Sequence, residues 1–276
     1  MKTNIWILNH YSGDMYLNKG GRHYWFAKFL NKKNYKPVIF CANTNHDNKG
    51  KKIFETDKLW EEHISEEINT PFVFVKAREY IGNGKKRILN MLDFYINVKK
   101  AAKQYSRLHG KPDVIVASSV HPLTLVAGIK LAKYFGVKCI CEVRDLWPES
   151  IVAYGVATKN NPLISLLYKL EKWIYKKADK IVMTIQGGPK YIEDKGWEKD
   201  IPVSKVTNIN NGVCLDEYNK LKEQYQFEDA DLDSNSFKVV YTGSIRLVNK
   251  VDDLLEAARI IKLRGNLYNI KILVWG

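Results

Sequence analysis

The chain has 276 residues, of which 45% are hydrophobic and 12% aromatic, and its formal net charge at pH 7 is +14. This composition excludes a disordered chain, and the length fits one large domain or two smaller ones. The apolar runs are too short for a membrane-spanning helix of about 18 residues or for the core of a signal peptide. The positive charge points to nucleic acid, an anionic membrane or phosphorylated substrates as partners, or reflects an AT-rich coding sequence that favours lysine.

Short apolar runs alternate with helical patterns along most of the chain. Several of the runs are apolar on both faces, as in a parallel sheet covered by helices on each side. The alternation therefore predicts a doubly wound α/β domain with a Rossmann-like sheet. In chain order we expect a strand at 4–9, a helix at 20–32, strands at 37–42 and 71–75, a helix at 87–108, a strand at 113–118, a helix at 123–135, a strand at 138–143, a helix at 162–178, and strands at 180–185 and 205–209.

The composition changes at 226–236, a stretch with four acidic residues and no glycine or proline. A new strand at 237–244, a helix at 249–264 and a strand at 270–276 follow it. Two strands and one helix rarely bury enough surface for a core of their own. We therefore expect a Rossmann-like domain at 1–225, a linker at 226–236 and the beginning of a second Rossmann-like domain, incomplete, at 237–276.

The cysteines contain no CxxC pair, so the sequence favours neither a zinc site nor a thioredoxin-like site. Cys139 and Cys141 lie two residues apart, on one face of the predicted strand 138–143. We expect reduced core cysteines and a cytoplasmic protein.

Ligands of doubly wound folds bind outside the carboxyl ends of the strands, so the loops there carry the site predictions. The first loop has Gly20, Gly21 and Arg22 just before or at the start of a helix. A glycine pair lets the backbone approach a ligand, and a helix N-terminus attracts an anion. A plain turn with a glycine cap explains the same residues.

The second loop is "SSVHPLT", Ser118–Thr124, in which Pro122 begins a helix. His121 lies at the carboxyl end of the strand, where it can hydrogen-bond a sugar or phosphate, or move a proton near neutral pH. The alternative is a capping or surface histidine.

The third loop is "CEVRDLWPES", Cys141–Ser150, in which charges crowd beside a tryptophan. Glu142 and Arg144 fall on one face of the departing strand, and Asp145 begins the turn. They form either a polar wall of a cleft, where charges are tolerated, or a structural ion pair.

Two further loops carry weaker signals. Asn211 and Gly212 form an Asn-Gly turn, which is also adequate as a simple loop. In "YTGSIRLVNK", Gly243 ends a strand, and Arg246 and Lys250 lie near the start of a helix, a setting that suits a diphosphate. Ordinary surface charge explains these two cations equally well.

Together, "GG", "RDLWPES", "INNGV" and "YTGS…VDDLLEA" resemble the family-four glycosyltransferases of the GT-B fold, especially bacterial enzymes that build surface polysaccharides. The resemblance spans the whole chain. It implies retaining transfer from a nucleotide-sugar to a glycan or polyprenyl-linked acceptor, with no cofactor and no required metal. The N-terminal domain would hold the acceptor and the C-terminal domain the nucleotide.

The resemblance also implies roles for the predicted site residues. Gly20 and Gly21 would lie near the donor phosphates or the acceptor, and His121 matches a histidine that contacts the donor sugar. Arg246 and Lys250 approximate the cations that stabilise the leaving diphosphate. The substrate-binding set is completed by Arg22, Glu142, Arg144, Asp145, Asn211 and Gly212, and the donor-phosphate set by Gly243.

The sequence departs from the family pattern at several positions. Cys214 stands where the family often has aspartate, Ser244 where it has arginine, and Asn249 where it has lysine. The downstream Glu-x7-Glu segment is absent because the sequence ends at Gly276. We therefore expect this chain to be inactive by itself; the alternative is a non-catalytic acceptor-binding subunit of a split GT-B enzyme.

The predicted helix in 84–111 bears on location. Lysines and arginines flank its wide apolar face, which fits peripheral attachment to an anionic membrane such as the inner face of the plasma membrane. A helix buried on one side with solvated lysines is the alternative. No nucleic-acid-binding motif accompanies the charge, so we do not expect a nucleic-acid partner.

Overall fold

The computed structural model describes residues 2–45, 50–82, 84–119, 121–226, 228–245, 249–265 and 269–276. The chain forms two compact units, Met1–Gly212 and Val213–Gly276. Arg246 lies outside the described residues. The predicted domain limits at 225 and 236 stay a prediction.

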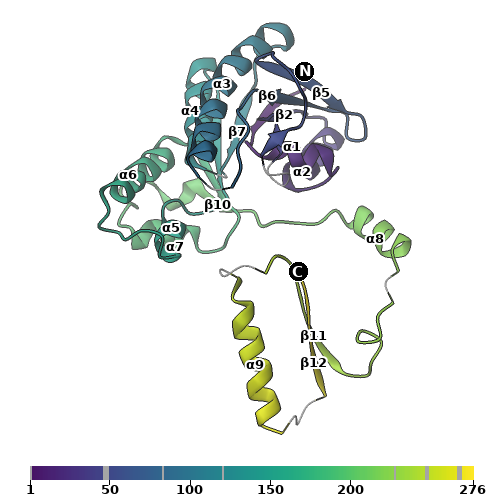
Figure 1. Ribbon diagram of the computed structural model, residues 1–276. Coiled ribbons are helices and arrows are strands. Elements are labelled where there is room, and N and C mark those ends of the chain that lie inside the picture. Colours follow the sequence, from purple (N-terminus) through teal and green to yellow (C-terminus); the bar gives the residue numbers. More distant parts are fainter. Residues whose placement is uncertain are drawn as a thin grey trace. The chain divides into compact units, whose positions relative to one another are not determined.

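The first unit is built on an eight-stranded sheet with the order β10-β9-β8-β7-β1-β2-β6-β5 (Figure 1). Its pairings are parallel except that of β5, an antiparallel edge strand next to β6. The predicted parallel sheet is therefore confirmed. The strands are β1 (Asn4–Leu8), β2 (Lys36–Ala42), β5 (Trp60–Ser65), β6 (Thr70–Val75), β7 (Val114–Ser118), β8 (Lys138–Val143), β9 (Lys180–Met183) and β10 (Val206–Asn208).

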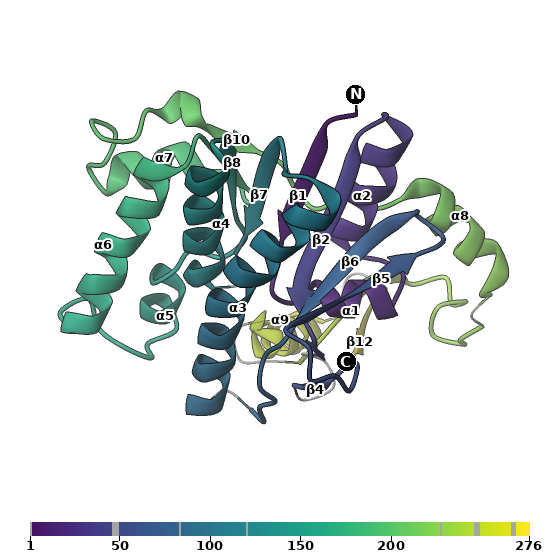
Figure 2. The ribbon, with the colours of Figure 1, turned by 90° about the horizontal axis from the view of Figure 1, so that it is seen from above.

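Helices cover both faces of this sheet, as the doubly wound prediction requires. The helices α3, α4 and α6 lie side by side on one face, and α1 and α2 cover the other (Figure 2). In chain order the helices of this unit are α1 (Ser12–Leu17), α2 (Arg22–Lys32), α3 (Lys85–His109), α4 (Pro122–Phe135), α5 (Glu149–Ala153), α6 (Pro162–Lys177) and α7 (Gly188–Asp194). Two short strands, β3 (Thr44–Asn45) and β4 (Lys51–Lys52), and the 3-10 helix η1 (Val203–Lys205) complete it.

The central strand β1 divides the core into two clusters because its side chains alternate between the faces. Trp6 and Leu8 join the cluster under α3 and α4, whereas Ile5 and Ile7 join the cluster under α2. All four are buried, so the strand reads as a continuous apolar run.

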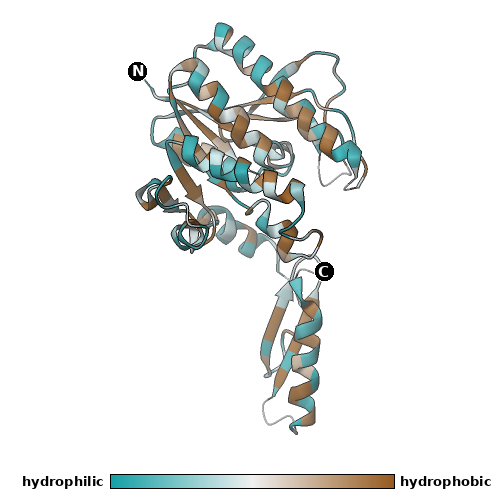
Figure 3. Ribbon diagram, turned by 90° about the vertical axis from the view of Figure 1, so that its left-hand side faces the viewer, coloured by the Kyte–Doolittle hydropathy of each residue, from teal (hydrophilic) through white to brown (hydrophobic). Residues whose placement is uncertain are grey.

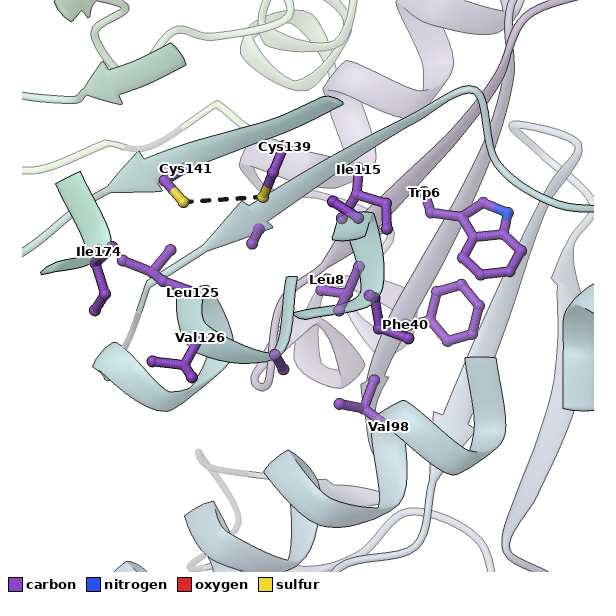
Figure 4. Close-up of a cluster of buried hydrophobic side chains, with 14 of the residues drawn as sticks. Trp6, Leu8, Phe40, Val98, Ile115, Leu125, Val126, Cys139, Cys141 and Ile174 are labelled. Atoms are coloured by element: carbon purple, nitrogen blue, oxygen red, sulfur yellow. Dashed lines mark hydrogen bonds between the residues drawn. The ribbon is translucent and has the colours of Figure 1, made fainter. Parts of the chain in front are cut away.

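The larger cluster is shown in Figure 4. The Trp6 and Phe40 rings lie 4.9 Å apart by centroid. The Sγ atoms of Cys139 and Cys141 lie 4.0 Å apart on the same face of β8, as their spacing predicted. All four cysteines of the chain are buried, and none of them forms a disulfide. Within this cluster α4 packs directly on β7 and β8, which places the loops at their carboxyl ends.

The second unit contains α8 (Leu215–Gln224), β11 (Phe237–Thr242), α9 (Val251–Leu263) and β12 (Ile270–Trp275). The two strands pair in parallel, so β11, α9 and β12 form one βαβ unit, and the predicted strand, helix and strand are confirmed. Within the described ranges, no helix of either unit combines the length and apolar character that crossing a bilayer requires.

Candidate functional site

The site lies at the carboxyl edge of β1, β7 and β8, and its centre is the carboxylate of Glu142. Glu142 is the fifth residue of β8 and is only 1% exposed. Its Oε2 accepts a hydrogen bond of 2.8 Å from Nε of Arg22, and its Oε1 accepts one of 2.8 Å from Oγ of Ser118. Nε2 of His23 lies 2.9 Å from the same Oε1. Every oxygen of this carboxylate therefore has a partner inside the protein.

Arg22 connects this carboxylate to a distant segment of the chain. The guanidinium donates from Nη1 to the carbonyl oxygen of Asn210 at 2.8 Å and from Nη2 to that of Ile209 at 2.9 Å. Nη1 also lies 3.3 Å from Oδ1 of Asn211. A guanidinium is suited to this task because its donors point in several fixed directions. The structure thus brings together three predicted site residues, Arg22, Glu142 and Asn211.

The tautomer of His23 follows from its neighbour Asn9. Oδ1 of Asn9 accepts from the backbone N–H of Tyr11 at 2.9 Å, so its Nδ2 faces Nδ1 of His23 at 3.0 Å. Since Nδ2 is a donor, Nδ1 of His23 accepts, and its Nε2 donates to Glu142. The residues Asn9, His23 and Ser118 were not among the predicted site residues. Their positions in the sequence could have identified them. Asn9 follows a strand, Ser118 ends one, and His23 follows the glycine pair.

The electrostatics of Glu142 favour its charged form. Burial raises the pKa of this carboxyl, but the hydrogen bond from His23, the charge of Arg22 and the hydrogen bond from Ser118 outweigh it and lower the pKa to about 2. The sequence left a cleft wall and a structural ion pair as alternatives. The geometry is that of a buried ion pair, and the partner of Glu142 is Arg22 rather than Arg144.

His121 lies beside this cluster and is 1% exposed. Its Nε2 is 2.8 Å from Nδ1 of His10, which comes from the end of β1. The two rings meet edge to face, with centroids 4.9 Å apart. In the described part of the chain, Nδ1 of His121 and Oγ1 of Thr124 are buried without a hydrogen-bond partner. Such orphaned polar atoms at a helix start are the kind of group that a ligand can satisfy.

The charge state of His121 limits what it can do. Burial, followed by the positive charge of Arg87, lowers the pKa of His121 to about 3. The ring is therefore neutral at pH 7, so it can hydrogen-bond a sugar or phosphate there. Of its two predicted uses, a pKa of about 3 favours this hydrogen bond over proton transfer near neutral pH.

Arg144 and Asp145 lie where β8 ends, but they take no part in the Glu142 cluster. The backbone N–H of Arg144 donates to Oγ of Ser119 at 3.0 Å, and its carbonyl oxygen accepts from Oγ1 of Thr184 at 3.3 Å. Asp145 is exposed and lines a small pocket beside the cluster, together with Trp147. The loop is therefore held by its backbone, which leaves the Asp145 carboxylate facing solvent.

The glycine pair shapes the start of α2. Gly21 is the N-cap residue and has φ of 101°, a value that favours glycine. A Cβ at Gly21 would also lie 3.0 Å from Cγ of Met15. Gly20 is half-buried and its N–H donates to the carbonyl of Met15 at 3.2 Å. Both glycines thus support the turn that delivers Arg22 and His23 to Glu142, and Gly21 is exposed at that point.

Two of the predicted donor-phosphate residues lie in the second unit. Gly243 follows β11 with φ of 141°, and Lys250 is the N-cap of α9 with φ of 51°. Nδ2 of Asn249 donates to the carbonyl oxygen of Ser244 at 2.6 Å, which closes the described part of this turn. Within the described residues, no group of three or more His, Cys, Asp or Glu side chains could hold a metal ion.

Sequence comparison adds a family match to this geometry. The model of "Glycosyltransferase Family 4" matches residues 24–217, which is more than half of the chain. Over 150 residues the chain is 25% identical to a curated protein described as probable glycosyltransferase WbjE, from Pseudomonas aeruginosa. The aligned stretch covers 54% of this chain and 36% of that protein, so the chain spans about a third of this relative's length.

Structure comparison finds further similar proteins at low sequence identity. The crystal structure of Anabaena Alr3699/HepE in complex with UDP and glucose has a TM-score of 0.49 at 13% identity, covering 99% of this chain and 70% of that one. The structure of Acinetobacter baumannii MurG has a TM-score of 0.45 at 13% identity, covering 98% and 68%. At these scores the fold assignment rests on the sheet topology, not on these likenesses.

Proposed function

Since the chain belongs to glycosyltransferase family 4, we propose that it serves the retaining transfer of a sugar from a nucleotide-sugar to a polysaccharide or lipid-linked acceptor. In this proposal Met1–Gly212 is the acceptor side of a GT-B enzyme. Val213–Gly276 belongs to its donor side, and we assign Gly243, Arg246 and Lys250 to binding of the donor phosphates. We expect hexosyl or N-acetylhexosaminyl transfer.

The observation that carries the proposal is that the stretch matched by the family model contains the centre of the polar cluster, Glu142, although Arg22 and His23 lie just before that stretch. Glu142, Ser118 and His121 all lie inside residues 24–217 and all lie at carboxyl ends of parallel strands or at the loop that follows. This edge is where doubly wound sheets bind ligands. The cluster is also prebuilt, because Glu142 is already fully hydrogen-bonded before any ligand arrives.

The chemistry of the cluster assigns different tasks to its members. Both oxygens of Glu142 are already paired, so it positions Arg22 and His23 and does not attack a sugar. His121 offers a neutral imidazole with an orphaned Nδ1, which can hydrogen-bond a sugar hydroxyl or a phosphate oxygen. Negative charge develops on the departing phosphate during transfer, and fixed donors and cations around it lower the barrier. The exposed backbone at Gly21 is placed to serve as such a donor.

We place the reaction in the cytoplasm, at the inner face of the membrane, because a polyprenyl-linked acceptor is confined to a bilayer. The protein would then attach peripherally. The exposed apolar and basic residues of α3 support this arrangement.

The proposal is tested with native protein purified from its source cells. The protein is incubated with membranes from the same cells and with a panel of radiolabelled nucleotide-sugars. We expect one donor to label a lipid-linked or polysaccharide product with the anomeric configuration of the donor. The variant His121→Ala should lose most of this transfer, whereas His109→Ala, an exposed histidine at the end of α3, should keep it.

Three outcomes separate the alternatives. Labelling of product with inverted configuration contradicts the retaining mechanism. Binding of acceptor without transfer from any donor identifies a non-catalytic acceptor-binding subunit. Equal loss of transfer in His121→Ala and His109→Ala contradicts the role of His121.

A further inference from the structure

One face of α3 carries a continuous stripe of outward side chains. Leu89, Leu92 and Ile96 are 39%, 38% and 45% exposed, and they follow one another at the three- and four-residue spacing of one helix face. The next two positions of the same stripe are Lys99 and Lys103. The stripe is therefore apolar in its first half and basic in its second.

The apolar half is wider than the stripe itself. Ile88 is 57% exposed on the same side of the helix, and Ile81 in the preceding loop is 79% exposed. Figure 3 shows the hydropathy of each residue along the ribbon. An exposed apolar ridge of this length, next to basic residues, is unusual on a free surface and marks an interaction site.

The basic half of α3 borders a groove that it shares with α4. The groove has a volume of about 410 Å³ and is lined by residues of these two helices. Nζ of Lys103 lies 3.9 Å from the ring centroid of Tyr134, so the two helices already contact each other across the groove. The lining residues are Lys99, Lys103, Lys130, Leu131, Lys133 and Tyr134.

Lysines from both helices also meet at Tyr95 of α3. Nζ of Lys99 lies 3.7 Å from the ring centroid of Tyr95, and Nζ of Lys130 donates to the Tyr95 hydroxyl at 2.8 Å. Burial raises the pKa of Tyr95, but these two lysines outweigh it and lower the pKa. The lysine heads are thus gathered at a fixed place instead of spreading into solvent.

No carboxylate balances this charge in the part of the chain that the structure describes. None of the four lysines of the groove forms an ion pair there. The single acid of α3, Asp93, is occupied by Arg78, with Nε and Oδ2 2.6 Å apart, and α4 has none. Such a groove attracts an anion strongly.

The neighbouring apolar ridge decides which kind of anion fits. Nucleic acid would neutralise the lysines but would leave Leu89, Leu92 and Ile96 exposed. A phospholipid surface satisfies both halves of the stripe. The acyl chains contact the apolar side chains, and the headgroup phosphates contact the lysines. A helix lying in the plane of the interface presents both halves at once.

We propose that the outer face of α3, together with the lysine groove between α3 and α4, is a docking surface for anionic phospholipids. Leu89, Leu92 and Ile96 enter the acyl region, and the groove binds headgroup phosphates. The docking surface is inferred from the structure of α3 and α4. Its role, to bring a lipid-linked acceptor to the site, rests on the proposed function.

The test is sedimentation of the purified full chain with vesicles of phosphatidylcholine alone or with 30% phosphatidylglycerol. We expect binding to the anionic vesicles that weakens as salt is raised. Each lysine near an anionic surface contributes about fivefold to binding. Replacing Lys99, Lys103, Lys130 and Lys133 by glutamine should therefore weaken binding at least about 20-fold.

A matched variant controls for net charge. Lys2, Lys33, Lys177 and Lys199 are exposed elsewhere on the first unit, and changing these four to glutamine should weaken binding less than about threefold. A second variant with Leu89→Ser, Leu92→Ser and Ile96→Ser should lose the binding that persists at high salt. Circular dichroism melting verifies that each variant is folded.

Several results would overturn the inference. Equal weakening by the two lysine sets would show a net-charge effect without a site. Equal binding to neutral and anionic vesicles would show that the lysines do not bind headgroup phosphates. Binding of duplex DNA that depends on the groove lysines, without binding of vesicles, would identify a nucleic-acid surface. Because the assay contains no sugar donor, its result is independent of whether transfer is found.

Discussion

Nη2 of Arg22 lies 2.8 Å from Oε2 of Glu142, in a pair whose side chains are only 4% and 2% exposed. The residues are 120 positions apart in the sequence. The pair joins the start of α2 to the end of β8, and through Arg22 it also holds the carbonyl groups of Asn210 and Ile209. One guanidinium therefore fixes three segments of the candidate site.

Removing one partner of this pair should destabilise the first unit strongly. Arg22→Met leaves the Glu142 carboxylate buried without its cation, and breaking a buried pair in this way costs about 3–5 kcal/mol. The exposed pair of Lys190 and Asp194 on α7 provides the control, and Lys190→Met should cost less than about 0.5 kcal/mol. Urea unfolding measures both free energies. Equal costs would contradict the importance of the buried pair.

A second buried carboxylate, Glu171 on α6, predicts an unusual dependence of stability on pH. It is 3% exposed and accepts hydrogen bonds from the hydroxyls of Tyr175, at 2.8 Å, and Tyr191, at 3.0 Å. Burial outweighs these bonds and raises the pKa of Glu171 to about 7. The folded chain therefore binds a proton more tightly than the unfolded chain between pH 4.5 and 7.

The stabilisation from Glu171 is fully present below pH 4.5 and is lost as the pH rises through about 7. The loss is roughly 3 kcal/mol. Glu171→Gln should abolish it, so the free energy of unfolding of the wild type should fall relative to the variant between pH 5 and pH 8. The lowered pKa of His121 acts in the opposite direction, but it is common to both proteins and cancels. Exposed Glu193→Gln should behave as the wild type, and parallel pH curves for Glu171→Gln and wild type would contradict the assignment.

His121 should contribute a hydrogen bond and not a titrating group. His121→Ala should lower kcat/KM for sugar transfer about 10- to 100-fold, the value of one buried hydrogen bond to a polar ligand. Because the pKa of His121 is lowered to about 3, the wild-type rate profile should show no inflection from this residue between pH 6 and 8. A profile measured for both proteins checks this, and an inflection near pH 6.5 that disappears in His121→Ala would refute it.

The sequence predicted the long elements well because their patterns are strong. The limits of β2, α4, β8 and α6 lie within one residue of the prediction, since each is a long apolar or amphipathic run between turn residues. The elements it missed are short or polar. The edge strand β5, "WEEHIS", is half exposed and pairs antiparallel with β6, so it lacks the apolar run that marks the central strands.

The sequence indicated which loops carry the candidate site, but not which of their side chains contact one another. The rule that ligands bind at carboxyl ends of strands selected the loops that hold Arg22, Glu142 and Asn211, and the structure brings these three residues together. It could not pair Arg22 with Glu142, because two charges 120 positions apart carry no local signal. The same limit applies to His10, which meets His121 only after β1 and β7 have paired.

Close packing between α4 and β7 gives the last prediction. A Cβ placed at Gly128 would lie 2.4 Å from Cβ of Ala117, inside any allowed contact, and both residues are in the core. Gly128→Ala must push α4 away from the sheet, and overpacking of this kind costs about 1–3 kcal/mol. Gly84→Ala is the control, because nothing lies within 4 Å of a Cβ there and its φ is −83°. Since His121 is the N-cap residue of α4, Gly128→Ala should also lower sugar transfer by moving that imidazole, whereas Gly84→Ala should leave both stability and transfer near the wild-type values.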